Sequence, residues 1–214
     1  MINQRFISII SILLLLITSS CITIINKVEI NPDKSGTAFI GVEINVLAKF
    51  KSLNSDISKD EKNTIIKFPE VIKEKLKDIK GISNIKTFGV VNFGRFGVEF
   101  DFKNAKALNK AYYRLLDKEY KWYYPSIIKI KARGIKVKNV SPYIKSYIEE
   151  NKDSFSEDII KFVDVATVIN VPKPIKSVDN DEGSISYNKS IFTYIIPLEN
   201  IMKDNASMGF RIKY

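Results

Sequence analysis

Few residues in this chain are of types that could catalyse a reaction or bind a metal. The residue types present exclude several classes of catalytic mechanism and metal site. The 214 residues contain no histidine and a single cysteine, Cys21. Without histidine, the Ser-His-Asp and Cys-His arrangements that activate a nucleophile are excluded in their usual forms, and so is a histidine pH switch. A zinc site is equally unexpected, because zinc is normally held by cysteine and histidine.

Carboxylates are the remaining candidates for catalysis or metal binding. The run Asp179–Gly183 carries calcium-type oxygen ligands, but its glycine comes one position earlier than in an EF-hand loop. Between strands such residues ordinarily form a turn. Glycosidase chemistry needs two carboxyl groups about 5–9 Å apart, and the spacing of Glu99, Asp101 and Glu149–Glu150 predicts no such pair. We expect no catalytic residue, no metal and no cofactor, and a carboxylate hydrolase remains an alternative.

The N-terminus has the order of an export signal. One cation, Arg5, precedes an apolar run from Phe6 to Ile17, and small residues follow at 18–20. This order is typical of a cleaved signal peptide. The apolar run is shorter than the about 20 residues that a membrane-spanning helix needs. We predict a signal peptide over residues 1–20, with a transmembrane anchor as an alternative.

Cys21 makes this signal more specific. The segment Ile17–Cys21 (Ile-Thr-Ser-Ser-Cys) resembles the bacterial lipobox, although Thr18 stands in place of the usual leucine. The resemblance implies cleavage between Ser20 and Cys21 and attachment of diacylglycerol to the Cys21 thiol. Lipidation accounts for the odd cysteine, which could form no internal disulfide. An ordinary signal peptide with an incidental cysteine is the alternative.

The lipobox resemblance also implies the compartment. Several acyl chains hold a protein stably on a membrane, at ~0.8 kcal/mol per buried CH₂. Ile22 rather than aspartate follows Cys21, and no acidic run comes next. We therefore expect an exported, lipid-anchored protein at the periplasmic face of the outer membrane in a two-membrane cell. In a single-membrane cell the anchor would lie in the outer leaflet, and export argues against nucleic acid as a partner.

A basic segment is the strongest candidate for binding. The formal net charge is +10, and residues 127–140 read as one strand in which cations alternate with apolar residues. A β-bulge near Gly134 would keep all the cations on one face. That face could contact anionic lipid or another envelope protein, and the alternative is an edge strand that uses lysine to block aggregation. The five cations are Lys129, Lys131, Arg133, Lys136 and Lys138.

An aromatic segment precedes this strand. Trp122, Tyr123 and Tyr124 follow Tyr112, Tyr113 and Tyr120 within a short stretch. Tyrosine and tryptophan favour surfaces with one dry and one wet side, so residues 122–124 could form an aromatic surface. Core packing is the favoured interpretation, because Tyr112 and Leu108 share a helical face.

Hydrophobic periodicity predicts an α+β fold. Strands at 24–30 and 37–49 form a hairpin, and a helix begins with Pro69 in its first turn and ends at Gly81. A second hairpin over 85–92 and 95–102 precedes a helix from Ala105 to Tyr120, capped by Asn104. These two strand–strand–helix units predict a mainly antiparallel sheet with helices on one face.

Helices from Ser141 to Glu150 and from Ser156 to Val163 follow. The C-terminal part is β-rich, with strands at 165–171, 175–178, 185–187, 191–196 and 208–213. We treat residues 21–214 as one domain, with an alternative boundary near 121–126.

The tail carries a family resemblance. Val168–Pro172 (Val-Ile-Asn-Val-Pro), Ile175–Asn180 and Ile191–Leu198 give a strand, a proline, a second strand ending in asparagine, and an aromatic-bearing strand that ends in leucine. This order resembles the close of small bacterial lipoproteins of the mycobacterial LppM type. Lys173 and Tyr194 replace the usual glycine and tryptophan. The resemblance implies a membrane-tethered α+β domain with lipid contact, and it carries over no catalytic residue. We therefore expect a non-enzymatic binding or scaffolding module, with an assembly partner of another envelope protein as the alternative.

The lipobox can be tested directly. Changing Cys21 to Ser removes the thiol that would carry the lipid, so metabolic labelling with radioactive palmitate should be abolished. Labelling that persists in the Cys21→Ser variant would refute the lipobox.

Overall fold

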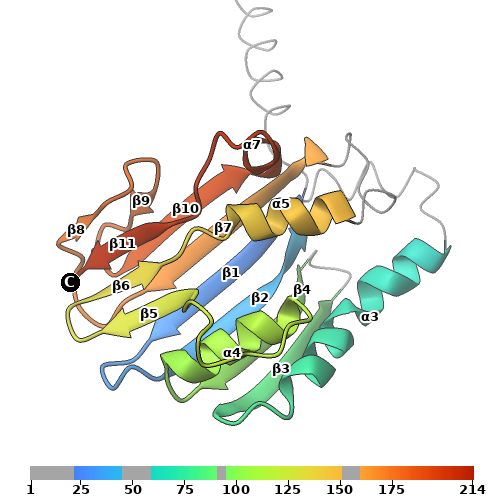
Figure 1. Cartoon of the computed structure of the whole chain (residues 1–214), viewed down its shortest axis with the longest axis horizontal. Helices are drawn as coiled ribbons and strands as arrows, with labels where there is room; N and C mark the ends of the chain where they lie inside the picture. The colour runs from blue at the N-terminus through green and yellow to red at the C-terminus, as the bar shows by residue number, and fades with distance from the viewer. Residues whose placement is uncertain (1–21, 45–58, 91–94, 151–159) are drawn as a thin grey trace, which may run out of the picture.

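The computed structural model describes residues 22–44, 59–90, 95–150 and 160–214, which form two β-sheets with helices on one side (Figure 1). Cys21 and the predicted signal peptide lie outside these residues. The predicted α+β class is confirmed. The strands are β1 (Ile22–Ile30), β2 (Gly36–Ile44), β3 (Ile82–Val90), β4 (Arg95–Phe102), β5 (Ile128–Lys131), β6 (Gly134–Val137), β7 (Val163–Asn170), β8 (Ser177–Val178), β9 (Ser184–Ile185), β10 (Ile191–Pro197) and β11 (Phe210–Lys213). The helices are α3 (Lys59–Leu76), α4 (Ala105–Leu115), α5 (Ser141–Glu150) and α7 (Leu198–Met202).

The larger sheet has seven strands in the order β3-β4-β2-β1-β7-β10-β9. Both predicted hairpins are present, β1 with β2 and β3 with β4. In β4, Val98, Phe100 and Phe102 are buried and alternate with more accessible residues, as their spacing predicts. Strand β7 joins β1 in parallel, from Ile22 opposite Val163 to Glu29 opposite Asn170. The C-terminal part of the chain therefore extends the sheet that the N-terminal part begins.

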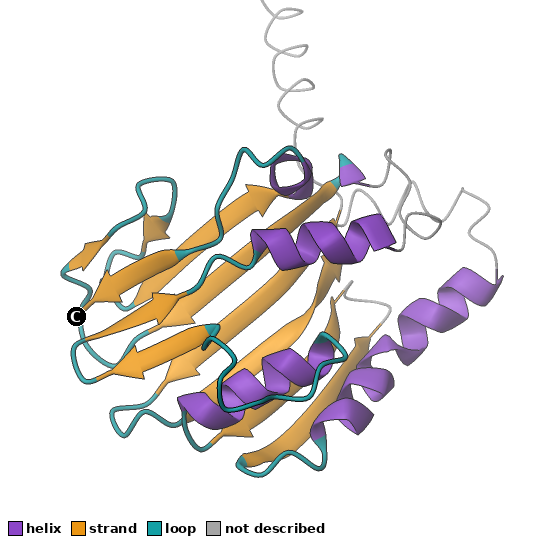
Figure 2. Ribbon diagram, in the orientation of Figure 1, coloured by secondary structure: helices purple, strands orange, loops and turns teal. Residues whose placement is uncertain are grey.

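The helices cover one face of the larger sheet (Figure 2). Asn104 caps α4 as predicted, since its side chain accepts a hydrogen bond from the Ala107 backbone N–H. The helix ends at Leu115 rather than near Tyr120. Among the residues that the structure describes, no helix is long and apolar enough to cross a bilayer.

Helix α3 corrects the predicted position of Pro69, which lies inside the helix and not in its first turn. A proline there removes one intrahelical hydrogen bond. The helix continues past Pro69 because α3 packs on β3 and β4, and this contact buries Ile72 and Leu76. Val71, by contrast, is 53% exposed.

The predicted basic strand over 127–140 is wrong as a single strand. The chain reverses at Ala132 and Arg133, and β5 pairs with β6 in an antiparallel hairpin. The alternation of cations and apolar residues changes phase near Gly134 because of this two-residue turn, and not because of a β-bulge.

Two smaller differences follow later in the chain. Val163 begins strand β7 rather than ending a helix, and the short helix α7 has no counterpart in the prediction.

The smaller sheet packs on the larger one. Its order is β5-β6-β11-β8, and Figure 1 shows it on the helix-bearing side of the larger sheet. The ring centroids of Phe192 in β10 and Phe210 in β11 are 4.8 Å apart. One hydrophobic core joins both sheets and the helices, with Val28, Phe100 and Leu108 fully buried in it.

Candidate functional site

The smaller sheet gathers cations on its outer face. Residues opposite one another in antiparallel strands point to the same side, as do residues two apart along a strand. Lys129 lies opposite Lys136, and Lys136 lies opposite Arg211. Gly134 lies opposite Lys131 in β5 and opposite Lys213 in β11, so these two lysines are on the same side of the sheet. We call the resulting set the cationic face: Lys129, Lys131, Lys136, Arg211 and Lys213.

The opposite side of this sheet is apolar. Ile128, Ile135 and Ile212 are buried against the core, so the cationic face must point outward. All five of its side chains are exposed, and they line a shallow depression of about 390 Å³. Within the described residues, no ion pair joins any of the five to a carboxylate.

Two of the five predicted cations occupy other positions. Arg133 lies in the turn between β5 and β6, where it is exposed and borders the same depression as the five cations of the face. Lys138 follows the end of β6, and its Nζ donates a hydrogen bond of 3.1 Å to the Tyr143 hydroxyl of α5. Lys138 is therefore tied to a helix, while β11 adds Arg211 and Lys213 from much later in the chain. Sequence reasoning missed these two because nothing local indicates that β11 pairs with β6.

Asn109 of α4 holds the first strand of the cationic face in place. Its side chain is 2% exposed and makes four hydrogen bonds. Oδ1 accepts from the backbone N–H groups of Ile127 at 2.6 Å and Ile128 at 3.0 Å. Nδ2 donates to the carbonyls of Ala105 at 2.6 Å and Ile128 at 2.7 Å. An amide side chain has two donors and two acceptor sites, so the amide of Asn109 is fully satisfied.

A second asparagine fixes the approach of β11. Asn139 Oδ1 accepts from the backbone N–H of Ser141 at 3.0 Å and of Met208 at 3.1 Å. Met208 precedes β11, and Ser141 begins α5. Both asparagines therefore act at the same end of the smaller sheet, where Ile128, Val137 and Phe210 lie opposite one another.

The Asp179–Gly183 run is a turn, as expected. Asn180 Oδ1 accepts from the N–H groups of Glu182 and Gly183. The Tyr194 hydroxyl donates to Glu182, and the Arg211 N–H donates to Asp179. One carboxylate oxygen of Asp179 and one of Glu182 are therefore engaged within the fold. The described residues contain no group of three or more carboxylate or cysteine side chains placed to hold a metal.

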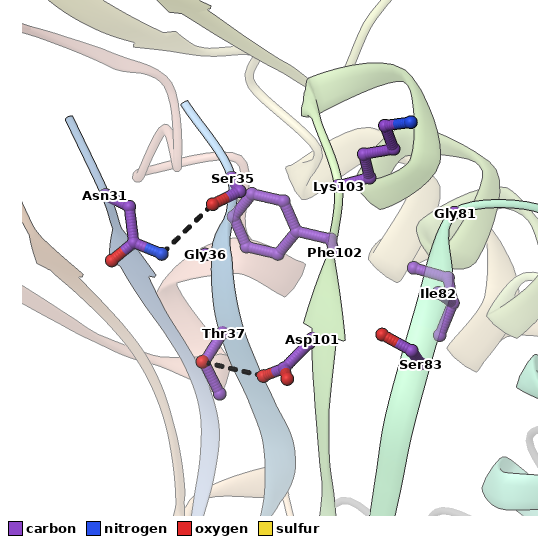
Figure 3. Close-up of a pocket in the computed structure, with 10 residues that line it drawn as sticks. All are labelled: Asn31, Ser35, Gly36, Thr37, Gly81, Ile82, Ser83, Asp101, Phe102 and Lys103. Atoms are coloured by element: carbon purple, nitrogen blue, oxygen red, sulfur yellow. Dashed lines mark hydrogen bonds between the residues drawn. The ribbon is translucent and has the colours of Figure 1, made fainter. Parts of the chain in front are cut away.

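Asp101, a carboxylate weighed for hydrolysis, borders a polar hollow of about 510 Å³ at the ends of β2, β3 and β4 (Figure 3). Oδ1 accepts from the Thr37 hydroxyl at 2.9 Å, and Oδ2 accepts from the Asn84 amide at 2.6 Å. No second acidic residue is among the described residues that line this hollow. Both oxygens of Asp101 therefore bind within the sheet, with no carboxylate partner across the hollow.

The aromatic segment divides between core and surface. Tyr112 and Tyr113 are buried, and the Tyr112 hydroxyl donates to Asn26 Oδ1 at 3.0 Å. Burial raises the pKa of Tyr112. Tyr124 packs on Tyr113 with ring centroids 5.1 Å apart, so it belongs to the core margin. Trp122 is 87% exposed and Tyr123 is 60% exposed, which leaves these two as the aromatic surface.

Comparison with known proteins gives one similarity. No protein-family model matches the chain, and no curated protein matches it. Among solved structures, the chain is similar to the folded domain of the Mycobacterium tuberculosis LppM protein, determined by NMR. That alignment has 10% sequence identity and a TM-score of 0.42, and it covers 92% of this chain and 91% of the other.

The cationic face should lower the stability of the protein. Like charges directly opposite in a sheet are destabilising by roughly 0.2–1 kcal/mol. In the Lys136→Glu variant, the new carboxylate lies opposite both Lys129 and Arg211. Urea unfolding should therefore show a free energy of unfolding higher by about 1 kcal/mol, with the gain shrinking at high salt. Lys121→Glu, at an exposed position outside the helices and strands, is the matched control. A stability of Lys136→Glu equal to or below that of the parent would contradict the charge arrangement.

Proposed function

We propose that this chain is an exported, lipid-anchored binding module of the bacterial cell envelope, without catalytic activity, whose cationic face binds an anionic membrane surface. The observation that carries the proposal is the cationic face itself: five exposed cations on the outer face of one sheet, with no carboxylate paired to them among the described residues.

The spacing of the cations suits a ligand that presents many separate anionic groups. Neighbouring strands lie about 4.8 Å apart, and residues two apart in a strand are separated by about 6.7 Å. Five cations at such spacings form an array that can contact several head groups together. Each lysine or arginine near an anionic membrane contributes about 1 kcal/mol, so the array acts by number rather than by one strong contact.

The position of the cationic face indicates which surface it could meet. Lys213 accepts a backbone hydrogen bond from Lys176, and Ile175 donates one to Lys189, which places this end of β11 beside the later ends of β7 and β1. Eight residues of extended β1 separate Ile22 from Ile30, a length of about 26 Å. The cationic face therefore lies toward the end of the domain away from Ile22 (Figure 1). An anchor at Cys21 would leave this face free for a surface other than its own leaflet.

A capture assay tests the proposal. The full-length chain is inserted through its N-terminus into phosphatidylcholine vesicles, and labelled vesicles with or without phosphatidylglycerol are added. We expect capture of the phosphatidylglycerol vesicles only. Capture should fall steeply as salt rises from 0.1 M to 1 M, since the Debye length shrinks from about 10 Å to about 3 Å. The triple variant K129E/K136E/K213E should capture at least about tenfold fewer vesicles, because each cation contributes about 1 kcal/mol.

The matched control is K67E/K80E/K106E, which changes the net charge equally at exposed lysines of other elements. Equal capture by both triple variants, or equal capture of vesicles without phosphatidylglycerol, would contradict the proposal. The distance of the cationic face from Ile22 also favours a second candidate, an acidic envelope protein. Salt-sensitive binding of polyglutamate without vesicle capture would select that candidate.

A further inference from the structure

A second cavity lies beyond the turn between β5 and β6 and shares Arg133 with the depression of the cationic face. It has a volume of about 590 Å³, within the range of small-molecule sites. Four of its lining residues are cations from three separated parts of the chain, and no acidic side chain lines it among the described residues. The lining residues are Ala132, Arg133, Lys173, Pro174, Ile175, Lys176, Lys189 and Tyr214.

Backbone hydrogen bonds fix the cavity as part of the fold. Ile175 N–H donates to the Lys189 carbonyl at 2.7 Å, and Lys176 N–H donates to Lys213 at 2.8 Å. Tyr214 N–H donates to the Arg133 carbonyl at 3.2 Å. The three segments that carry the cations are therefore joined to one another at the walls of the cavity. Arg133, Lys173, Lys176 and Lys189 are all exposed at its rim.

The floor of the cavity differs chemically from its rim. Ile175 and Tyr214 are buried, and Ala132 and Pro174 add further apolar surface. The Tyr214 hydroxyl donates to the Lys131 carbonyl at 3.2 Å, and burial raises the pKa of Tyr214. The phenol is therefore neutral at ordinary pH. The cavity thus combines an apolar floor with a rim of positive charge.

We propose that this cavity binds a phosphate-bearing ligand that also has an apolar portion. Arg133 can hold two phosphate oxygens with its planar guanidinium, and the three lysines supply point charges around the same group. The apolar portion of the ligand would cover Ile175 and Tyr214. This site goes beyond the membrane-surface function, because it requires a single ligand of definite shape rather than a charged plane.

The test uses the full-length chain in a non-ionic detergent, titrated separately with phenyl phosphate and inorganic phosphate at constant ionic strength. Amide NMR shifts of Lys176, Lys189 and Tyr214 report binding. Phenyl phosphate should bind at least about tenfold more tightly than inorganic phosphate, because its ring removes apolar surface of the floor from water. The R133Q/K189Q variant should weaken phenyl phosphate binding at least about tenfold, since it removes two charge-assisted hydrogen bonds to the phosphate.

Three variants separate the outcomes. K80Q/K106Q, with the same change of charge elsewhere, should bind phenyl phosphate as the parent does. K129E/K136E, which changes two lysines of the cationic face that do not line the cavity, should retain phenyl phosphate binding even though it lowers vesicle capture, which distinguishes this site from the cationic face. Equal affinity for the two phosphates would overturn the role of the apolar floor. Binding that R133Q/K189Q leaves unchanged, or no shift at the three amides, would overturn the site.

Discussion

Asn109 is the side chain on which the position of the cationic face depends. Strand β5 is an edge strand, and an edge strand leaves backbone groups without partners in the sheet. Asn109 supplies partners to Ile127 and to both backbone groups of Ile128 from inside the core. A buried polar group left unpaired costs about 1–3 kcal/mol. One helix of the first half of the chain therefore fixes the start of the smaller sheet.

Charge and burial then act in opposite directions across that sheet. The apolar side, which includes Ile128, Ile135 and Ile212, is buried and draws the hairpin and β11 onto the core. The outer side collects cations opposite one another, as with Lys129 and Lys136, and this arrangement opposes folding. Burial exceeds the repulsion, because burying an aliphatic side chain contributes about 1.5–3 kcal/mol while an opposed like-charge pair costs less than about 1 kcal/mol. The sheet can therefore keep a surface of one charge without losing its fold.

Local patterns predicted the parts of the fold that depend on local contacts. Alternation in β4, the Asn104 cap and both hairpins of the larger sheet could all be read from neighbouring residues. The β5–β6 turn could not, because Ala132 and Arg133 carry none of the glycine or asparagine that marks tight hairpins. The parallel pairing of β1 with β7, and the addition of Arg211 to the cationic face, depend on contacts between distant segments. Asn109 gave no signal either, since an asparagine in an amphipathic helix ordinarily faces solvent.

The most direct test of this account is amide hydrogen exchange in the Asn109→Leu variant. Leucine fills a similar volume but offers no hydrogen bonds, so no charge changes. The account predicts exchange at least about tenfold faster at the amides of β5 and β6, since losing a single partner costs about 1–3 kcal/mol. Amides of Val28 and Ile169, in the larger sheet, serve as the internal reference, and capture of anionic vesicles should fall together with the protection of the hairpin. Unchanged protection of β5, with undiminished capture, would contradict the account.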